Sequence, residues 1–161
     1  GVVRTLLPRI PAGRRVAIIF DHNMGGGANQ YRRGIVDERV AAGSSVVLCT
    51  YNLPTLDYRL VLHAMGATNE VFRVSSFLSL EPLFERLPAA EIFVNSTVSF
   101  DDPLLFAEWI ARMRALHPTT RLTVTAHDFF AVCPSFVLLD ADGRYCGVPG
   151  VDVCGRCLPR R

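Results

Sequence analysis

Apolar runs and amphipathic stretches alternate along the chain. Residues 15–20 form a nearly continuous apolar run, which is typical of a strand buried on both faces of a sheet. A glycine-rich stretch follows, then apolar positions at helical spacing between residues 28 and 40, and then a second apolar run at 45–50. This order predicts a strand, a loop, a helix that ends near Gly43, and a second strand, which together make a βαβ unit.

The same alternation continues to about residue 126, after which turn-forming residues dominate. The elements expected after the second strand are an edge hairpin at 58–64 and 70–74, a helix at 80–87, a strand at 91–94, a helix at 103–116 and a strand at 122–126. Alternating strands and helices predict an α/β fold with a mostly parallel sheet and helices on both of its faces.

The chain has 161 residues, which fits one compact domain. We expect a linker at 1–13, the α/β domain at 14–132, and a cysteine-rich segment at 133–161. Because a Cys-x-x-Cys pair lies close to the last residue, we also expect the natural chain to continue into a further domain.

Composition and charge exclude several function classes. The net charge of +2 is too small to indicate a nucleic-acid partner. No run of about 18 apolar residues is present to span a membrane. All 17 basic residues are arginine, which excludes mechanisms that need an ε-amine, such as a P-loop lysine or a Schiff base.

Polar residues gather where three of the expected strands end. His22 and Asn23 precede Gly25, Gly26 and Gly27 after the first strand, and Asn29 follows in the same loop. The other two groups are Asn95 with Ser96, and His127 with Asp128. Ligands of open α/β sheets bind at the carboxyl ends of the strands, so parallel strands would bring these groups to one edge.

The three glycines at 25–27 have two interpretations, a ligand-binding loop or a structural turn. They let the backbone approach a ligand and precede a helix N-terminus, which favours an anionic group, or they form only a tight turn. The loop is not G-x-G-x-x-G, and Tyr51 and Asn52 stand where a ribose-binding acid would follow the second strand. A dinucleotide site is therefore not expected.

The other polar groups also leave alternatives open. His127 and Asp128 fit a functional pair or a plain turn, and Asn95 and Ser96 fit a ligand contact or a cap. A Ser-His-Asp hydrolase is not supported, because no G-x-S-x-G elbow is present.

Four of the five cysteines fall in the last 29 residues, whereas Cys49 lies alone in an apolar run. The clustered residues are Cys133, Cys146, Cys154 and Cys157, and the last two have the short spacing of a zinc knuckle. They could bind a structural Zn²⁺, since a closed four-cysteine site leaves no open position for catalysis, or they could form disulfides or remain free thiols.

Several segments together resemble bacterial glycosyltransferases of the GT-B fold, in particular those of glycosyltransferase family four that build cell-surface polysaccharide. The segment 125–134, Thr-Ala-His-Asp-Phe-Phe-Ala-Val-Cys-Pro, is the most specific part. Residues 138–140, 143–146 and the Cys154 to Cys157 pair, the glycine loop and residues 93–95 fit the same pattern. The resemblance covers about residues 15–158, which is the first half of such an enzyme.

This resemblance implies the Rossmann-like, doubly wound N-terminal domain that mainly holds the acceptor. His127 would lie at the reaction centre, with Asp128 beside it, and the glycine loop would face the donor phosphates. A sugar would pass with retention, and without a catalytic cofactor or metal, from a nucleotide-sugar donor to a glycan or lipid-linked acceptor. The donor would be shared with a C-terminal domain that this chain lacks, so this chain alone would be inactive.

The resemblance also implies a cytoplasmic protein, with peripheral association at the inner face of the plasma membrane. Two other functions remain open from the residues themselves. One is a non-catalytic, zinc-stabilised α/β interaction module. The other is a small hydrolase or deaminase-like enzyme that uses His127 and a cysteine-bound metal.

Overall fold

The structure is a computed structural model that describes residues 2–66, 69–86, 89–130, 133 and 135–160. The chain divides into two compact units, Gly1–Thr125 and Ala126–Arg161. The first unit holds the sheet and its helices, and the second is turn-rich and ends in a short helix.

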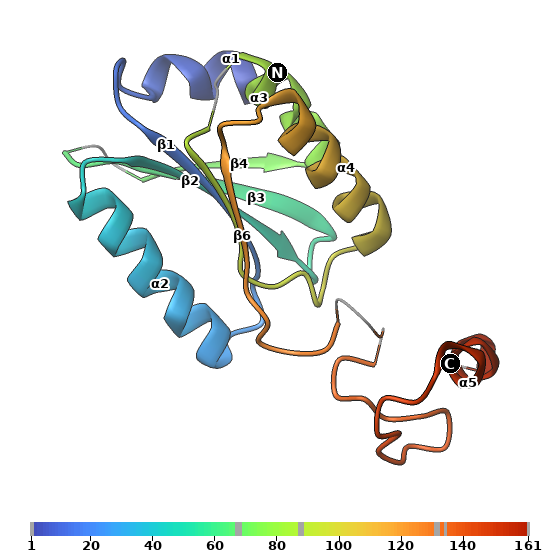
Figure 1. Ribbon diagram of the computed structural model, residues 1–161. Helices are drawn as coiled ribbons and strands as arrows, with labels where there is room; N and C mark the ends of the chain where they lie inside the picture. Colours follow the sequence, from blue (N-terminus) through green and yellow to red (C-terminus); the bar gives the residue numbers. More distant parts are fainter. Residues whose placement is uncertain (1, 67–68, 87–88, 131–132, 134, 161) are drawn as a thin grey trace. The chain divides into compact units, whose positions relative to one another are not determined.

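The described residues of the first unit form one six-stranded sheet in the order β4-β3-β2-β1-β5-β6 (Figure 1). The central strand β1 pairs in parallel with β2 and β5, and β5 pairs in parallel with β6, whereas β3 and β4 form an antiparallel hairpin at one edge. The strands are Val16–His22 (β1), Ser45–Asn52 (β2), Asp57–His63 (β3), Glu70–Val74 (β4), Glu91–Val94 (β5) and Arg121–Val124 (β6). The predicted α/β fold, mostly parallel sheet and edge hairpin are thus confirmed.

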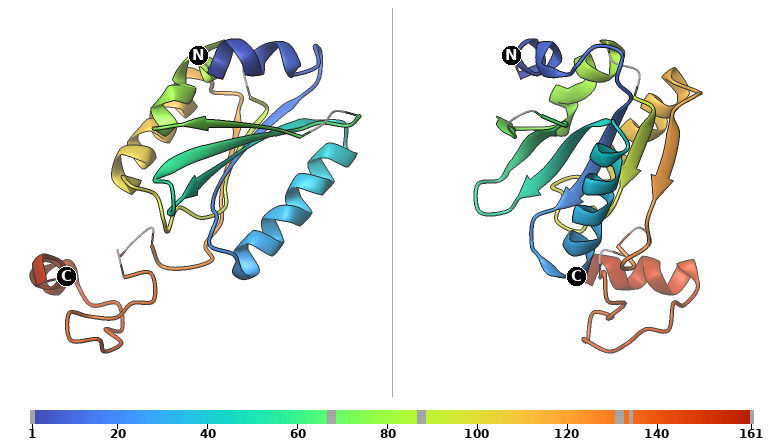
Figure 2. Two further views of the ribbon diagram at one scale, coloured as in Figure 1. Left: turned by 180° about the vertical axis from the view of Figure 1, so that it is seen from behind. Right: turned by 90° about the vertical axis from the view of Figure 1, so that its left-hand side faces the viewer.

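Helices cover both faces of this sheet, as Figures 1 and 2 show. One face carries α2 (Gly26–Ala41), and the other carries α1 (Val2–Leu6), α3 (Glu81–Arg86) and α4 (Pro103–Leu116). Two short 3₁₀ turns, Leu7–Arg9 and Phe77–Leu80, lead out of α1 and into α3. Within the described residues, no helix combines the length and the apolar character needed to cross a bilayer.

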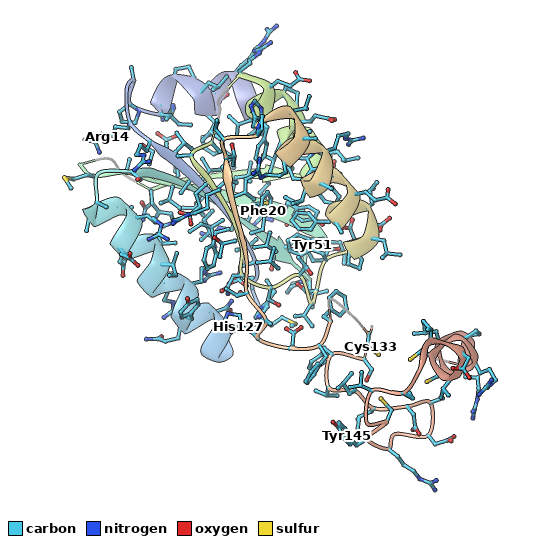
Figure 3. All side chains as sticks on the ribbon, in the orientation of Figure 1. Arg14, Phe20, Tyr51, His127, Cys133 and Tyr145 are labelled. Carbon is cyan, nitrogen blue, oxygen red and sulfur yellow. The ribbon has the colours of Figure 1, made fainter. Side chains whose placement is uncertain are left out.

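The two faces of the sheet pack against cores of unequal size. On the α4 side, Phe20 of β1 meets the rings of Phe106 and Trp109 edge-on, and Tyr51 belongs to the same core (Figure 3). On the α2 side, a smaller core joins alternate strand residues such as Ile19 to Val36 of the helix. The alternation follows from the period of two along a strand.

Local sequence signals set the ends of the long helices. The carboxylate of Asp102 accepts a hydrogen bond from the backbone N–H of Leu105 at 2.9 Å, and Pro103 opens α4. Gly43 follows α2 with a φ of 82°, and its N–H donates to the carbonyl of Val40 at 2.9 Å. Both ends lie where the sequence predicts them.

The N-terminal residues differ from the linker expected at 1–13. They contain α1 and a 3₁₀ turn, and Leu6 and Ile10 are buried in the larger core. Arg4, Pro8 and Arg9 of this segment are exposed, and Pro11 is partly exposed. The segment is therefore anchored by an i, i+4 apolar pair that is too short to stand out in the sequence.

The second unit is built from turns. The Asp140 carboxylate accepts hydrogen bonds from the backbone N–H groups of Asp142 and Arg144, each at 2.9 Å. Leu139 and Tyr145 form an isolated antiparallel bridge across this turn. The unit ends in α5 (Val151–Cys157) and the 3₁₀ turn Leu158–Arg160.

A charged cluster joins α2 to the amino-terminal ends of β5 and β6. Glu91 is only 5% exposed and accepts hydrogen bonds from Arg39 Nε at 2.7 Å and Arg121 Nη2 at 2.7 Å. Burial on its own would raise the pKa of Glu91, but the two guanidinium groups outweigh it and hold that pKa below its usual value.

We expect Glu91→Gln to lower the free energy of unfolding by about 2 kcal/mol at pH 7, because the hydrogen bonds to Arg39 and Arg121 lose the charge of their acceptor. The pKa of Glu91 is lower in the folded state, so its carboxylate stabilises the fold above the unfolded pKa of about 4.3, and this contribution disappears as the pH falls through the folded value. Urea unfolding of both proteins between pH 7 and pH 3 should show the difference shrinking. Glu38→Gln, which removes an exposed partner of Arg39, is the control and should cost under about 0.5 kcal/mol. A constant difference across this pH range would contradict the assignment.

Candidate functional site

The order of the strands places a topological switch point at β1. The chain runs from β1 through α2 to β2 on one side, and later returns to β5 on the other side of β1. Crevices outside the carboxyl ends of strands at such a point are where open α/β sheets bind ligands. The carboxyl ends of β1, β5 and β6 lie at one edge, as the sequence predicts.

The glycine loop lies at this switch point and leads directly into α2. Gly25 and Gly26 have φ values of 88° and 83°, a region that residues with side chains avoid. Gly27 has no such need, and a Cβ atom added to it would meet no described atom within 4 Å. The N-cap residue of α2 is Gly25, which has no side chain to accept the first N–H groups of the helix. Its first N–H groups, which lack intrahelical partners, therefore form the anion-favouring end of the helix dipole.

A buried polar cluster fixes the loop to the end of β1. The carboxylate of Asp21, which is fully buried, accepts hydrogen bonds from Asn29 Nδ2 at 2.8 Å and from the N–H of His22 at 2.9 Å. Asn29 Oδ1 in turn accepts the N–H of Gly25 at 2.6 Å, and His22 Nδ1 accepts the N–H of Met24 at 3.1 Å. The side chains of Asp21, His22 and Asn29 thus fix the path of the glycine loop.

Arg32 completes this cluster from the next turn of α2. Its Nη1 lies 3.2 Å from Asp21 Oδ2 and donates to the carbonyl of His22 at 3.3 Å. Burial lowers the pKa of Arg32, and the charge of Asp21 partly opposes that shift. Arg32 is only 8% exposed, and its guanidinium group balances the buried carboxylate.

Asn95 and Ser96 are close to the glycine loop but buried. Asn95 Nδ2 donates to the carbonyl of Ala28 at 3.0 Å, and Thr125 Oγ1 donates to the carbonyl of Asn95 at 2.6 Å. Ser96 Oγ accepts the N–H of Val98 at 3.4 Å. Asn29 and Asn95 thus hold the loop and the strand ends together, whereas the printed bond of Ser96 is local. Direct contact of Asn29, Asn95 and Ser96 with a ligand stays a prediction.

His127 and Asp128 belong to the second unit, Ala126–Arg161. His127 is exposed (Figure 3), and Asp128 Oδ1 accepts the N–H of Phe130 at 2.8 Å, which makes a tight turn. The structure therefore contains the turn that was one of the two interpretations of this pair. A catalytic role for either residue stays a prediction.

The four clustered cysteines also lie in the second unit, and each is a partly exposed free thiol. Cys154 Sγ lies 3.8 Å from the carbonyl of Pro149. The described residues contain no cluster of three or more metal-ligating side chains. The zinc site formed by Cys133, Cys146, Cys154 and Cys157 thus stays a prediction.

Sequence reasoning missed Asp21 and Arg32, the charged pair beneath the loop. A signal for them exists, because Asn29, Arg32 and Val36 recur at the spacing of one buried helix face. Asp21 likewise closes an apolar run, where a buried carboxylate requires a partner.

No protein-family profile, curated protein or solved structure matches this chain. The geometry of the switch point and the sequence pattern are therefore the basis for a functional proposal.

We expect Asp21→Asn to destabilise the first unit by about 3 kcal/mol, because it leaves the buried Arg32 without its counter-ion. Arg32→Met in the same background should recover part of the loss, since it removes the uncompensated charge. Thermal and urea unfolding of the two single variants and the double variant form a double-mutant cycle. Additivity within about 0.5 kcal/mol would contradict the coupling of these two residues.

The zinc prediction has a direct measurement. If the four thiolates bind Zn²⁺, the purified chain should contain about one zinc per molecule by elemental analysis, and Cys157→Ser should lose most of it. Cys49→Ser is the matched control, because Cys49 is buried in the larger core of the first unit. Zinc content that is absent, or equal in both variants, would favour free thiols or disulfides.

Proposed function

We propose that this chain is the N-terminal, acceptor-side half of a GT-B glycosyltransferase that builds cell-surface polysaccharide. It would move a sugar from a nucleotide-sugar donor to a glycan or lipid-linked acceptor, with retention and without a catalytic metal. The observation that carries the proposal is the glycine loop at the switch point, which opens α2 with a glycine at the N-cap in place of a side chain that would accept the first N–H groups.

Gly27 supports a ligand at this loop. Its backbone does not need positive φ, and its missing Cβ faces open space, so nothing among the described residues accounts for a glycine there. A ligand that approaches the backbone closely supplies a reason. Alanine would also be the better helix former at this position.

The chemistry of sugar transfer fits such a loop. Cleavage of the bond to the nucleotide places negative charge on the leaving diphosphate and positive charge on the sugar. Backbone N–H groups that are already oriented by the helix stabilise that developing negative charge without reorganising. The chain has no lysine, so phosphate contacts here come from arginine, backbone N–H groups or neutral polar side chains.

The segment around His127 supports the family. In the proposed enzyme, His127 hydrogen-bonds the transferred sugar and Asp128 orients the turn that carries it. The main nucleotide pocket belongs to the C-terminal domain of that enzyme, so the 161-residue chain alone should bind nucleotide sugars weakly and turn none over.

We expect Gly27→Ala to lower kcat/KM for sugar transfer about tenfold to a hundredfold, because a methyl group would displace the donor phosphates. The assay uses the protein that carries this chain with its donor-binding domain, a panel of nucleotide sugars and lipid-linked glycan acceptors. Gly34→Ala, also in α2 and also facing open space, is the matched control. Both variants should keep or raise the free energy of unfolding, by up to about 1 kcal/mol.

His127→Ala in the same assay tests the second element of the proposal and should reduce transfer while nucleotide binding persists. Full transfer by Gly27→Ala and His127→Ala, or the absence of transfer with every donor, would contradict the proposed function.

A further inference from the structure

A groove of about 500 Å³ runs beside α2, over the sheet face of β2, β3 and β4. It exists because α2 is the only helix among the described residues that covers this face, while the edge hairpin extends beyond it. Its size falls within the range of small-molecule sites. It is lined by residues of α2 and the three strands, and also by Asn23 in the loop before Gly25 and by Asn69 before β4. Gly25, Gly26 and Gly27 are not among its described lining residues.

One end of the groove is cationic. Arg59 stands in register with Thr50 across β2 and β3, and Arg32 and Arg33 line the groove from α2. Asp37 is the one acid among its lining residues. Arg33 and Arg59 form no ion pair with any residue that the structure describes, whereas Arg32 pairs with Asp21. Since Asp21 neutralises Arg32, the guanidinium groups of Arg33 and Arg59 against the carboxylate of Asp37 leave a surplus of one positive charge in the groove.

Two buried polar atoms of the lining residues lack a hydrogen-bond partner among the described residues. They are Nε of Arg32, a residue that is 8% exposed, and Nε2 of His63. Each such atom costs free energy while it is unpaired. A bound oxyanion, directly or through a bridging water, would supply the acceptor that Arg32 Nε requires.

Four of the lining residues are apolar. Leu48, Val61 and Val71 form one row across β2, β3 and β4, because Val61 is in register with both of the others. Val36 faces this row from α2. His63 also lines the groove, and burial lowers the pKa of its imidazole. The groove therefore offers charge at one end and apolar contact at the other.

We propose that this groove binds a small organic phosphate, with its phosphate group held by Arg33 and Arg59 and its apolar body lying along Val61 and Val71. A phosphate monoester carries nearly two negative charges at pH 7, and Arg33 and Arg59 offer one guanidinium group to each of them. The fork of donors on arginine suits phosphate oxygens. This site does not depend on the proposed glycosyltransferase activity.

The test is a titration of the 161-residue chain with phenyl phosphate, inorganic phosphate and benzyl alcohol, followed by ¹H–¹⁵N NMR. Phenyl phosphate should shift the side-chain Nε–H signals of Arg33 and Arg59 and the amide signals of Val61 and Val71. It should bind about tenfold more tightly than inorganic phosphate, because roughly half of the ring is removed from water. Benzyl alcohol should produce little shift.

The double variant Arg33→Gln, Arg59→Gln should weaken phenyl phosphate at least about tenfold, since two charge-assisted contacts are lost. Both side chains are exposed, so the fold should persist. Arg112→Gln on α4 is the matched control and should leave the affinity within about twofold. Shifts confined to Gly25–Gly27 would place phosphate at the loop and overturn the groove site. Equal affinity in the double variant, or equal binding of the ring without its phosphate, would also overturn it.

Discussion

The buried carboxylate of Asp21 is the constraint on which the site depends. It sits at the end of the central strand, out of water, and a charge there requires compensation. The compensation comes from Asn29, Arg32 and the backbone N–H of His22. Asn29 also accepts the N–H of Gly25, so the position of Asp21 determines that of the loop. The position of the glycine loop is therefore defined by a hydrogen-bonded chain that begins inside the sheet, not by the loop residues themselves.

The helix that follows is fixed at both ends by charge, because its apolar contact with the sheet is small. Asp21 binds the first turns of α2, and Glu91 binds Arg39 in its last turn. Only a few residues, including Val36 and Ile19, make up the core between them. Apolar burial is not directional, whereas the two polar anchors fix the position of the helix along the sheet. The N-terminus of α2 is thereby held at the carboxyl edge of β1 and β5.

Periodicity in the sequence predicted nearly every strand and helix, because strands buried on both faces and amphipathic helices leave strong patterns. It placed the end of the first strand too early, since Asp21 and His22 are buried by pairing and hydropathy cannot anticipate a partner. For the candidate site, the sequence predicted that the glycine loop follows the first strand at the carboxyl edge of the sheet. The buried roles of Asn29 and Asn95 were not predicted, because an amide that binds a ligand and one that holds a loop look the same in a sequence.

In these contacts, arginine does what lysine could not, because one guanidinium group binds two acceptors. Arg39 grips Glu91 with two nitrogens, Nε at 2.7 Å and Nη2 at 3.3 Å, and one guanidinium of Arg32 serves both Asp21 and the carbonyl of His22. A lysine is a point charge without such a fork and could not hold two groups in one plane. A sheet whose helix is fixed by charged anchors therefore gains orientation as well as attraction from arginine, and the fixed orientation of α2 is what aims its N-terminal N–H groups at the switch point.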